Sequence, residues 1–273
     1  LALQVGGNDP QELAHAARLA QAWGYDEINL NCGCPSERVQ RGAFGACLMA
    51  EPMLVRDCVA AMREAAPSLP VTVKHRIGID RGESYDFVRD FVGTVAEAGC
   101  KVFIVHARNA WLKGLSPKEN REVPPLRHDF VYRLKRDFPA LTLVLNGGVA
   151  GNEQIAEHLR HVDGVMLGRE AYHRPWSMAE WDRRFLGDAG GAVPTREGVE
   201  AAMAEYMTAL VARGVSWPHA ARHMMGLMHG LPGARRWRQV LSDHKLNDVA
   251  PAQVMQQARQ AMLARSNETE ALA

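Results

Sequence analysis

The chain alternates between short runs of apolar residues and longer segments with helical periodicity. Short apolar runs bounded by turn-forming residues are typical of buried parallel strands. Such runs lie at residues 1–7, 27–33, 69–76, 100–108, 141–148 and 162–168. Strand-like runs that alternate with helical segments predict repeated βα units.

The segments between these runs carry signals for helix ends. Asp9 and Pro10 offer a cap and a proline at the first helical position, and Gly24 can end this helix. Ser84 can cap a second helix that ends at Gly99, and a third runs over residues 128–138. Apolar residues at helical spacing are expected to face the sheet: Leu13, Ala16, Ala17, Ala20, Trp23, Phe87, Phe91, Val92, Val95, Phe130, Val131 and Leu134.

Repeated βα units form either a closed (β/α)8 barrel or an open, doubly wound sheet. Two observations favour the barrel: no Gly-rich dinucleotide fingerprint follows any run, and polar residues stand at the C-terminal ends of the runs. We therefore expect an α/β fold, a (β/α)8 TIM-type barrel, over residues 1–187. A barrel has eight strands and the chain opens on Leu1 inside a strand-like run, so we expect about two strands to be missing at the N-terminus.

The pattern changes after Gly187, where the segment GDAGGAVPT is rich in glycine and alanine. From Thr195 onward the sequence shows only helical patterns. We therefore predict a small α-helical domain over residues 195–273.

The composition is typical of a globular protein and disfavours membrane proteins and secreted proteins held by disulfides. The 273 residues, 47% hydrophobic and 23% charged, suit one large and one small globular domain. No apolar run approaches the roughly 20 residues that span a bilayer, so we expect no membrane segment. The formal net charge is only +1, so any nucleic-acid surface must come from local clustering of charge. Five cysteines without a regular framework fit a reducing, cytoplasmic location.

Polar residues or glycines follow each apolar run. They are Gln4, Asn31 with Cys34, Lys74 with Arg76, His106 with Arg108, Asn146 with Gly147 and Gly148, and Gly168 with Arg169. In a barrel these positions form a ring around one ligand, although loops are polar in any protein. The two glycine segments allow a backbone to approach a phosphate closely, and the alternative is that they merely end strands.

Several side chains of this set are suited to chemistry. Cys34 lies just beyond a strand and before a Gly-rich loop, where a thiol is exposed enough to act as a proton donor. A metal site formed by Cys32 and Cys34 is the weaker alternative, because no second Cys/His pair accompanies them, and we expect no metal. Lys74 could stabilise a negatively charged cofactor, and His106 could donate a hydrogen bond or a proton. The other cysteines, Cys47, Cys58 and Cys100, suit small buried positions.

The helical tail carries a cluster of positive charge. Between residues 213 and 238 there are five arginines and no acidic residue, with Trp237 among them. Such a cluster suits an RNA backbone, and guanidinium and indole groups can also stack on bases. A solvated helix face explains the same charges equally well.

Seven segments together resemble one enzyme family, from the first residue nearly to the last. They are LNCGCPSERVQRGAFGACLM, VTVKHRIGID, FIVHAR, LSPKENREVPPL, LNGGV, DGVMLGREA and RHMMGLMHGLPGARRWR. These segments resemble the tRNA-dihydrouridine synthases, and most closely their subfamily A. The resemblance implies an FMN-binding (β/α)8 barrel followed by a helical domain that holds tRNA, with NADPH as electron donor and uridines 20 and 20a as targets.

The resemblance also implies roles for individual positions. Cys34 matches the general acid that protonates uracil C5 while hydride reaches C6, and Asn31 matches a neighbouring tRNA-contacting asparagine. The positions that match FMN-binding residues are Gln4, Lys74, His106, Asn146, Gly147, Gly148, Gly168 and Arg169. The positions that match tRNA contacts are Lys118, Arg121, Arg235 and Arg238. We expect a monomer with tRNA as its partner.

The chain departs from the family at its start. Members begin with a strand and an Ala-Pro-Met loop that contacts FMN, followed by a second strand, and neither precedes Leu1 here. Two alternatives therefore stay open. One is an FMN barrel that reduces a free pyrimidine, which the arginine-rich tail disfavours. The other is a non-catalytic tRNA-binding remnant.

Overall fold

The computed structural model describes residues 1–82, 84–187 and 190–264. By its internal contacts the chain divides into two compact units, Leu1–Leu167 and Gly168–Ala273. The division falls earlier than the composition change at Gly187, on which the predicted domain boundary rests. Residues 188–189 of the predicted linker, and residues 265–273 of the predicted helical domain, lie outside the described residues.

The first unit is built on one parallel sheet. Its strands are β1 (Ala2–Val5), β2 (Glu27–Cys32), β3 (Val71–Arg76), β4 (Val102–His106), β5 (Thr142–Asn146) and β6 (Gly164–Met166). Neighbouring strands in the sheet are also neighbours in sequence, from β1 to β6, and every pair is parallel. Each predicted strand is confirmed. Because the strand order never reverses, the sheet is not doubly wound.

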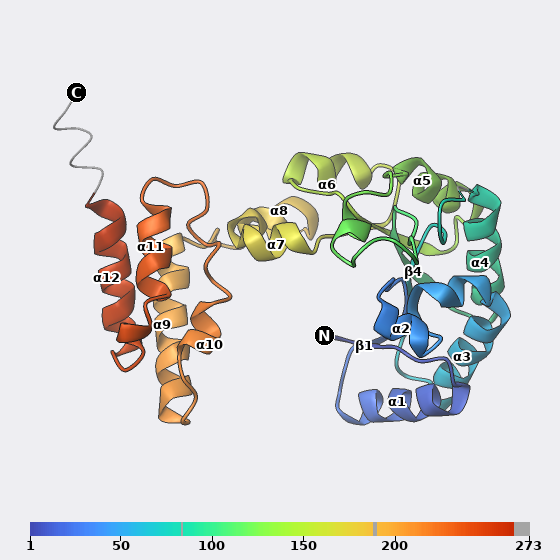
Figure 1. The fold of residues 1–273 in the computed structure, drawn as a ribbon, viewed down its shortest axis with the longest axis horizontal. Coiled ribbons are helices and arrows are strands. Elements are labelled where there is room, and N and C mark those ends of the chain that lie inside the picture. Colours follow the sequence, from blue (N-terminus) through green and yellow to red (C-terminus); the bar gives the residue numbers. More distant parts are fainter. Residues whose placement is uncertain (83, 188–189, 265–273) are drawn as a thin grey trace. The chain divides into compact units, whose positions relative to one another are not determined.

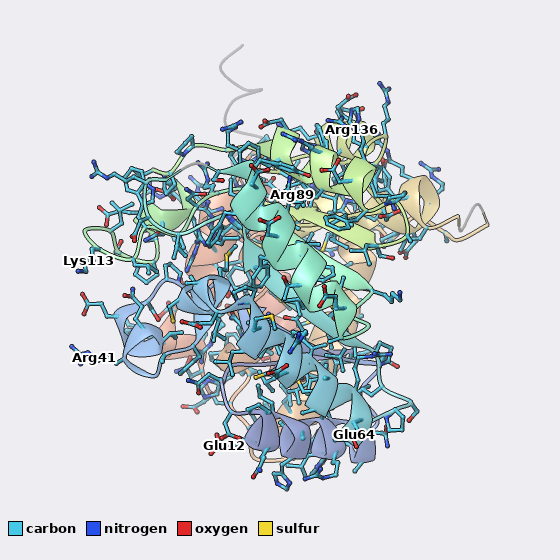
Figure 2. The ribbon with its side chains drawn as sticks, turned by 90° about the vertical axis from the view of Figure 1, so that its right-hand side faces the viewer. Glu12, Arg41, Glu64, Arg89, Lys113 and Arg136 are labelled. Atoms are coloured by element: carbon cyan, nitrogen blue, oxygen red, sulfur yellow. The ribbon has the colours of Figure 1, made fainter. Side chains whose placement is uncertain are left out.

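Helices connect the strands and pack along one side of them (Figure 1). They are α1 (Pro10–Ala22), α3 (Pro52–Ala65), α4 (Tyr85–Glu97), α5 (His128–Asp137) and α6 (Asn152–His158). Helix α1 packs on α3, and α3 packs on α4. Figure 2 looks onto this outer layer, where the charged ends of Glu12, Glu64 and Arg136 lie at the surface.

The helix ends and the apolar helix faces follow the sequence signals closely. Asp9 accepts hydrogen bonds from the backbone of Gln11 and Glu12, and Ser84 accepts one from Phe87. Among the residues expected to face the sheet, the prediction for Trp23 is wrong, because this residue is 79% exposed. Trp23 is the C-cap of α1, so it lies beyond the last residue whose direction the helical period sets.

The two faces of the sheet differ in polarity because successive strand residues point to opposite sides. One face carries apolar side chains that the helices bury completely, including Ile28, Leu30, Val73, Phe103 and Leu145. The register places the polar residues of neighbouring strands on the opposite face. The core of the unit therefore lies between the sheet and the helices, and polar side chains gather on the opposite face.

Short helices shape the loops at the C-terminal ends of the strands. Helix α2 (Glu37–Arg41) and the 3-10 turn η1 (Gly45–Ala50) follow β2, and η2 (Glu119–Arg121) lies between β4 and α5. These loops occupy the end of the sheet at which parallel α/β proteins place their ligands.

The second unit is helical throughout its described residues, including residues 168–187, which the sequence assigned to the barrel domain. It contains α7 (Arg169–His173), η3 (Pro175–Glu180), α8 (Trp181–Phe185), α9 (Arg196–Ala212), α10 (Pro218–Ala221), α11 (Ala234–Leu241), η4 (His244–Leu246) and α12 (Pro251–Leu263). Its own core is centred on two fully buried tryptophans, Trp217 and Trp237, packed with Met207. None of the described helices combines the length and apolarity that crossing a membrane requires.

Candidate active site

Polar side chains from neighbouring strands lie in register on the open face of the sheet. Asn31 on β2 pairs with Lys74 on β3, and His106 on β4 pairs with both Arg76 and Asn146 on the adjacent strands. Register partners in parallel strands point to the same side. The first unit therefore brings together the predicted residues of β2 to β5, at the C-terminal edge of one face.

A chain of hydrogen bonds fixes the side chains of β1, β2 and β3 on this face. The Gln4 amide donates to Asn29 Oδ1 at 2.7 Å, and the Asn29 amide donates to Thr72 Oγ1 at 2.8 Å. Asn31 Nδ2 donates to Gln4 Oε1 at 3.2 Å. Gln4 and Asn31, assigned separately to cofactor and tRNA, are thus in direct contact.

Asn31 also positions the loop that carries Cys34. Its Oδ1 accepts the backbone N–H groups of Gly33 at 2.9 Å and Cys34 at 3.1 Å. The Cys34 carbonyl accepts the N–H of Ala46, and a Cβ added at Gly45 would stand 2.7 Å from that carbonyl oxygen. Only glycine fits there, at a φ of +74°. The half-buried thiol is therefore held from both sides, with the Ser36 hydroxyl 3.4 Å away.

Arg76 joins the Cys34 loop to the loop after β4. Its guanidinium donates to the carbonyl oxygens of Gly33 at 3.0 Å, Asn109 at 2.9 Å and Asn120 at 2.8 Å. The residue is 4% exposed, and burial followed by the nearby Arg121 lowers its pKa to about 10, so it keeps its charge at neutral pH. The sequence predicts Arg76 at a strand end and indicates no role for it. Its carbonyl partners lie more than 30 residues away along the chain.

The charge around Lys74 and His106 is strongly positive. Burial, then Arg76, lowers the pKa of Lys74 to about 8. Burial also lowers the pKa of His106 to about 2, and the charged neighbours that add to this effect are all cations: Arg76, Lys74, Arg108 and Arg121. His106 is therefore neutral at physiological pH, in a site suited to an electron-rich or anionic ligand.

Lys74 and His106 each present a polar atom without a partner among the described residues. The ammonium of Lys74 has no hydrogen-bond or ion-pair partner among the described residues, and neither has the buried Nδ1 of His106. Unpartnered buried polar groups are costly and are retained where a ligand satisfies them. These two atoms are therefore suited to contact a polar ligand.

The glycines after β5 allow close approach of the backbone. Gly147 and Gly148 have φ values of +110° and +76°. A Cβ on Gly147 would lie 3.3 Å from His106 Cε1, and His128 Nε2 lies 2.9 Å from the Gly147 carbonyl oxygen. Asn146 Nδ2 donates to the carbonyl oxygen of Met166, which ties this loop to β6.

The predicted residues beyond β6 belong to the second unit. Gly168 and Arg169 directly follow the strand region, are exposed, and start helix α7. On α11, Arg235 is exposed and Arg238 half-buried. The prediction that Trp237 can stack on bases is wrong, because the indole is fully buried and donates to Glu200 Oε1 at 2.9 Å. The helical period of α11 turns this residue into the core between the arginines.

The loop between β4 and α5 holds the two remaining tRNA candidates. Lys118 is exposed at the start of η2, and Arg121 lies at its end. Arg121 is close enough to lower the pKa values of both Arg76 and His106. Arg121 therefore borders the site, whereas nothing ties Lys118 to it.

The cysteines other than Cys34 take structural positions. Cys32 is fully buried on the helix-covered face, and burial raises its pKa far above the usual range. It therefore cannot share a metal with Cys34, and the described residues contain no cluster of metal-ligating side chains. Cys58 and Cys100 are buried as expected, and Cys47 is half-buried with its thiol 3.0 Å from the Phe44 carbonyl oxygen.

Comparison with known proteins yields one family. The sequence profile of the dihydrouridine synthase family matches residues 1–264. A tRNA-dihydrouridine(20/20a) synthase from Shewanella oneidensis is 54% identical over 262 residues, which are 96% of this chain and 78% of that protein. The enzyme of the same name from Salmonella typhi is 55% identical over 260 residues, covering 94% and 77%.

Among solved structures, a morphinone reductase in complex with tetrahydroNAD is similar with a TM-score of 0.44 and 14% identity, covering 69% of this chain and 51% of that one. This likeness is too weak to carry a conclusion.

Proposed function

The chain belongs to the dihydrouridine synthase family, and we propose that it is a flavin-dependent enzyme that reduces the C5=C6 bond of uridines 20 and 20a in tRNA. Two relatives more than half identical to this chain bear the name tRNA-dihydrouridine(20/20a) synthase. The observation that carries the proposal is the fixed thiol of Cys34 beside a cationic, incompletely partnered cluster on one face of the sheet.

The residues present fit FMN. The unpartnered Lys74 ammonium and His106 Nδ1 suit the polar edge of a flavin ring, and Gly147 and Gly148 allow the backbone to approach a phosphate. The proposed binding residues are Gln4, Lys74, His106, Asn146, Gly147, Gly148, Gly168 and Arg169. When bound and reduced by NADPH, FMN supplies the hydride that is added at uracil C6.

Cys34 completes the reaction by giving the thiol proton to uracil C5. Proton transfer requires that the donor be held within hydrogen-bond reach of the carbon, and the contacts of Asn31 and Ala46 fix the loop for that purpose. Cations around the site stabilise the negative charge that the uracil ring takes up before it is protonated.

The substrate uridine must leave the RNA stack to reach this face. The proposed contacts to the surrounding RNA backbone are Lys118, Arg121, Arg235 and Arg238, and the proposed contact to the extruded base is Asn31. The five free cysteines fit the proposed cytoplasmic location, and tRNA is the proposed partner of a monomeric enzyme.

The sheet supports the proposed (β/α)8 barrel. Six parallel strands in sequential order, with helices on one face and polar residues on the other, form the arrangement from which such barrels are made. The polar face becomes the interior of the barrel, and its C-terminal edge becomes the active-site rim. The structure describes six strands, so the eight-stranded closure stays a prediction.

The decisive experiment compares wild-type protein with Cys34→Ala and a control, Cys47→Ala. We expect the purified wild type and both variants to show flavin absorbance bands. With NADPH and unmodified tRNA, wild type and Cys47→Ala should form dihydrouridine, and Cys34→Ala should lose at least about a hundredfold in rate.

The outcomes separate the alternatives. Protein that retains tRNA but shows no flavin bands is a non-catalytic remnant. Reduction of free uracil in preference to tRNA indicates a free-pyrimidine reductase. Full activity of Cys34→Ala removes the thiol from the mechanism.

A further inference from the structure

The second unit contains a pocket of which the proposed function uses only one lining residue, Arg238. It has a volume of about 230 Å³. Its lining includes Tyr172 and His173 of α7, Arg222, His223 and His229 of the loop between α10 and α11, and Arg238 of α11.

The lining is rich in hydrogen-bond donors and has no acidic residue. Two guanidinium groups and three imidazoles face the pocket, and no carboxylate is among its lining residues. Neither Arg222 nor Arg238 forms an ion pair within the described residues, although Arg222 contacts the ring of His219. The nearby Glu170 is held by Arg174 at 3.3 Å. Two guanidinium groups and several hydrogen-bond donors without a carboxylate among them suit an anion.

The pocket walls are fixed by close packing. A Cβ on Gly226 would stand 2.2 Å from the His173 carbonyl oxygen, so the loop can reach α7 only with glycine there. The Tyr172 hydroxyl lies 3.0 Å from His223 Nδ1. When the hydroxyl donates, the neutral imidazole carries its proton on Nε2, where it can serve another acceptor.

We infer that this pocket binds one phosphodiester group of the tRNA backbone. The inference rests on the proposed function and extends it by adding Tyr172, His173, Arg222, His223 and His229 to the RNA-contacting surface around Arg238. The volume lies below the roughly 300–1,000 Å³ of pockets for whole small-molecule ligands. It suits a phosphate with the edges of its sugars, and guanidinium groups bind phosphate oxygens through paired hydrogen bonds.

The test measures tRNA affinity of the full, flavin-loaded chain as a function of salt. The variants are Arg238→Gln and His229→Gln, and the control is Arg183→Gln, which removes an exposed charge of α8 outside the pocket. Because His229 is exposed, its replacement leaves the fold intact even if Arg238→Gln does not. Flavin absorbance of each variant reports whether the cofactor is retained.

We expect Arg238→Gln to weaken tRNA binding about tenfold at fixed salt and to lower the slope of log K against log [salt] by about 1. His229→Gln should weaken binding about threefold, and Arg183→Gln should stay within twofold of wild type. Flavin content should be unchanged in all three.

Wild-type affinity in both pocket variants, or loss of flavin from them, overturns the pocket assignment while the proposed function stands. Equal weakening by Arg183→Gln also overturns it, because the effect is then one of net charge. Absence of tRNA binding by the wild type overturns the proposed function together with the pocket.

Discussion

Two neighbouring residues of β3 differ in charge at neutral pH although burial lowers the pKa of both. Lys74 points to the open face, and burial lowers its pKa to about 8, so the ammonium stays charged. His75 points to the helices, is fully buried between Phe91 and Phe103, and has a pKa of about 4 because burial disfavours its charged form. The Arg76 carbonyl oxygen lies 2.6 Å from its Nδ1.

The pKa of His75 predicts an acid-sensitive fold. Between pH 6.5 and 4 the unfolded chain binds a proton at this residue and the folded chain does not, so folding stability falls as pH falls through that window. From pH 7 to 5 the loss attributable to His75 is about 2 kcal/mol. His75→Leu should lose correspondingly less stability over this range, as urea unfolding at the two pH values will show. Equal losses in wild type and variant would contradict the prediction.

The backbone conformation of Gly147 predicts that a side chain at this position lowers both stability and flavin content. A side chain is strained at a φ of +110°, so Gly147→Ala should cost about 1–3 kcal/mol and displace the loop proposed to hold FMN phosphate. Flavin content after purification should fall severalfold. Gly151→Ala is the matched control, because its φ is −173° and no atom lies within 4 Å of the added Cβ. Equal flavin content in the two variants would remove Gly147 from the cofactor site.

The positions of those secondary-structure elements that depend on local signals were predictable from the sequence. The Asp9 and Ser84 caps set helix starts, and apolar periodicity placed Leu134 on the buried face of α5. The errors arose where tertiary packing decides. Trp237 lies in an arginine-rich stretch that is typical of a surface, yet α11 packs on α12 and the buried indole donates to Glu200 of α9.

Helices α9, α11 and α12 meet at one buried carboxylate. Glu200 is 3% exposed, accepts the indole N–H of Trp237 and accepts Arg259 Nε at 3.0 Å. Arg259→Met leaves this charge buried and unpaired, which should destabilise the unit by about 2 kcal/mol, a value reduced because Arg259 is partly exposed to solvent.

The double variant Glu200→Gln with Arg259→Met should recover part of this loss, because the neutral amide still accepts from the indole. Denaturant unfolding of the two variants measures the difference. A double variant no more stable than Arg259→Met alone would show that charge burial is not the cause.

At the scale of the whole molecule, each compact unit has its own core. The first is buried between sheet and helices, and the second lies around Trp217 and Trp237. Units with separate cores open separately. Met207→Ala, in the core of the second unit, should speed amide exchange in α11 and α12 and leave β2 to β5 protected.

The reciprocal variant, Leu134→Ala, should speed exchange in the first unit alone. Mass spectrometry of exchanged peptides distinguishes the units. Loss of protection in both units from either variant would show one cooperative fold.

The candidate site was predictable only in part. Parallel strands place their C-terminal ends at one edge, so the strand ends alone brought Asn31, Lys74 and His106 together. The contacts that orient them were not predictable. The hydrogen bonds of Arg76 depend on how loops far apart in sequence fold over the sheet, and no local pattern encodes that path.

The guanidinium of Arg76 donates hydrogen bonds to main-chain carbonyl oxygens, which every amino acid possesses. The hydrogen bonds of Arg76 therefore involve no side chain at positions 33, 109 and 120, although Asn109 and Asn120 are themselves buried and hydrogen-bonded to neighbouring loops. A substitution at an exposed position such as Lys118 therefore leaves the anchor of the Cys34 loop in place.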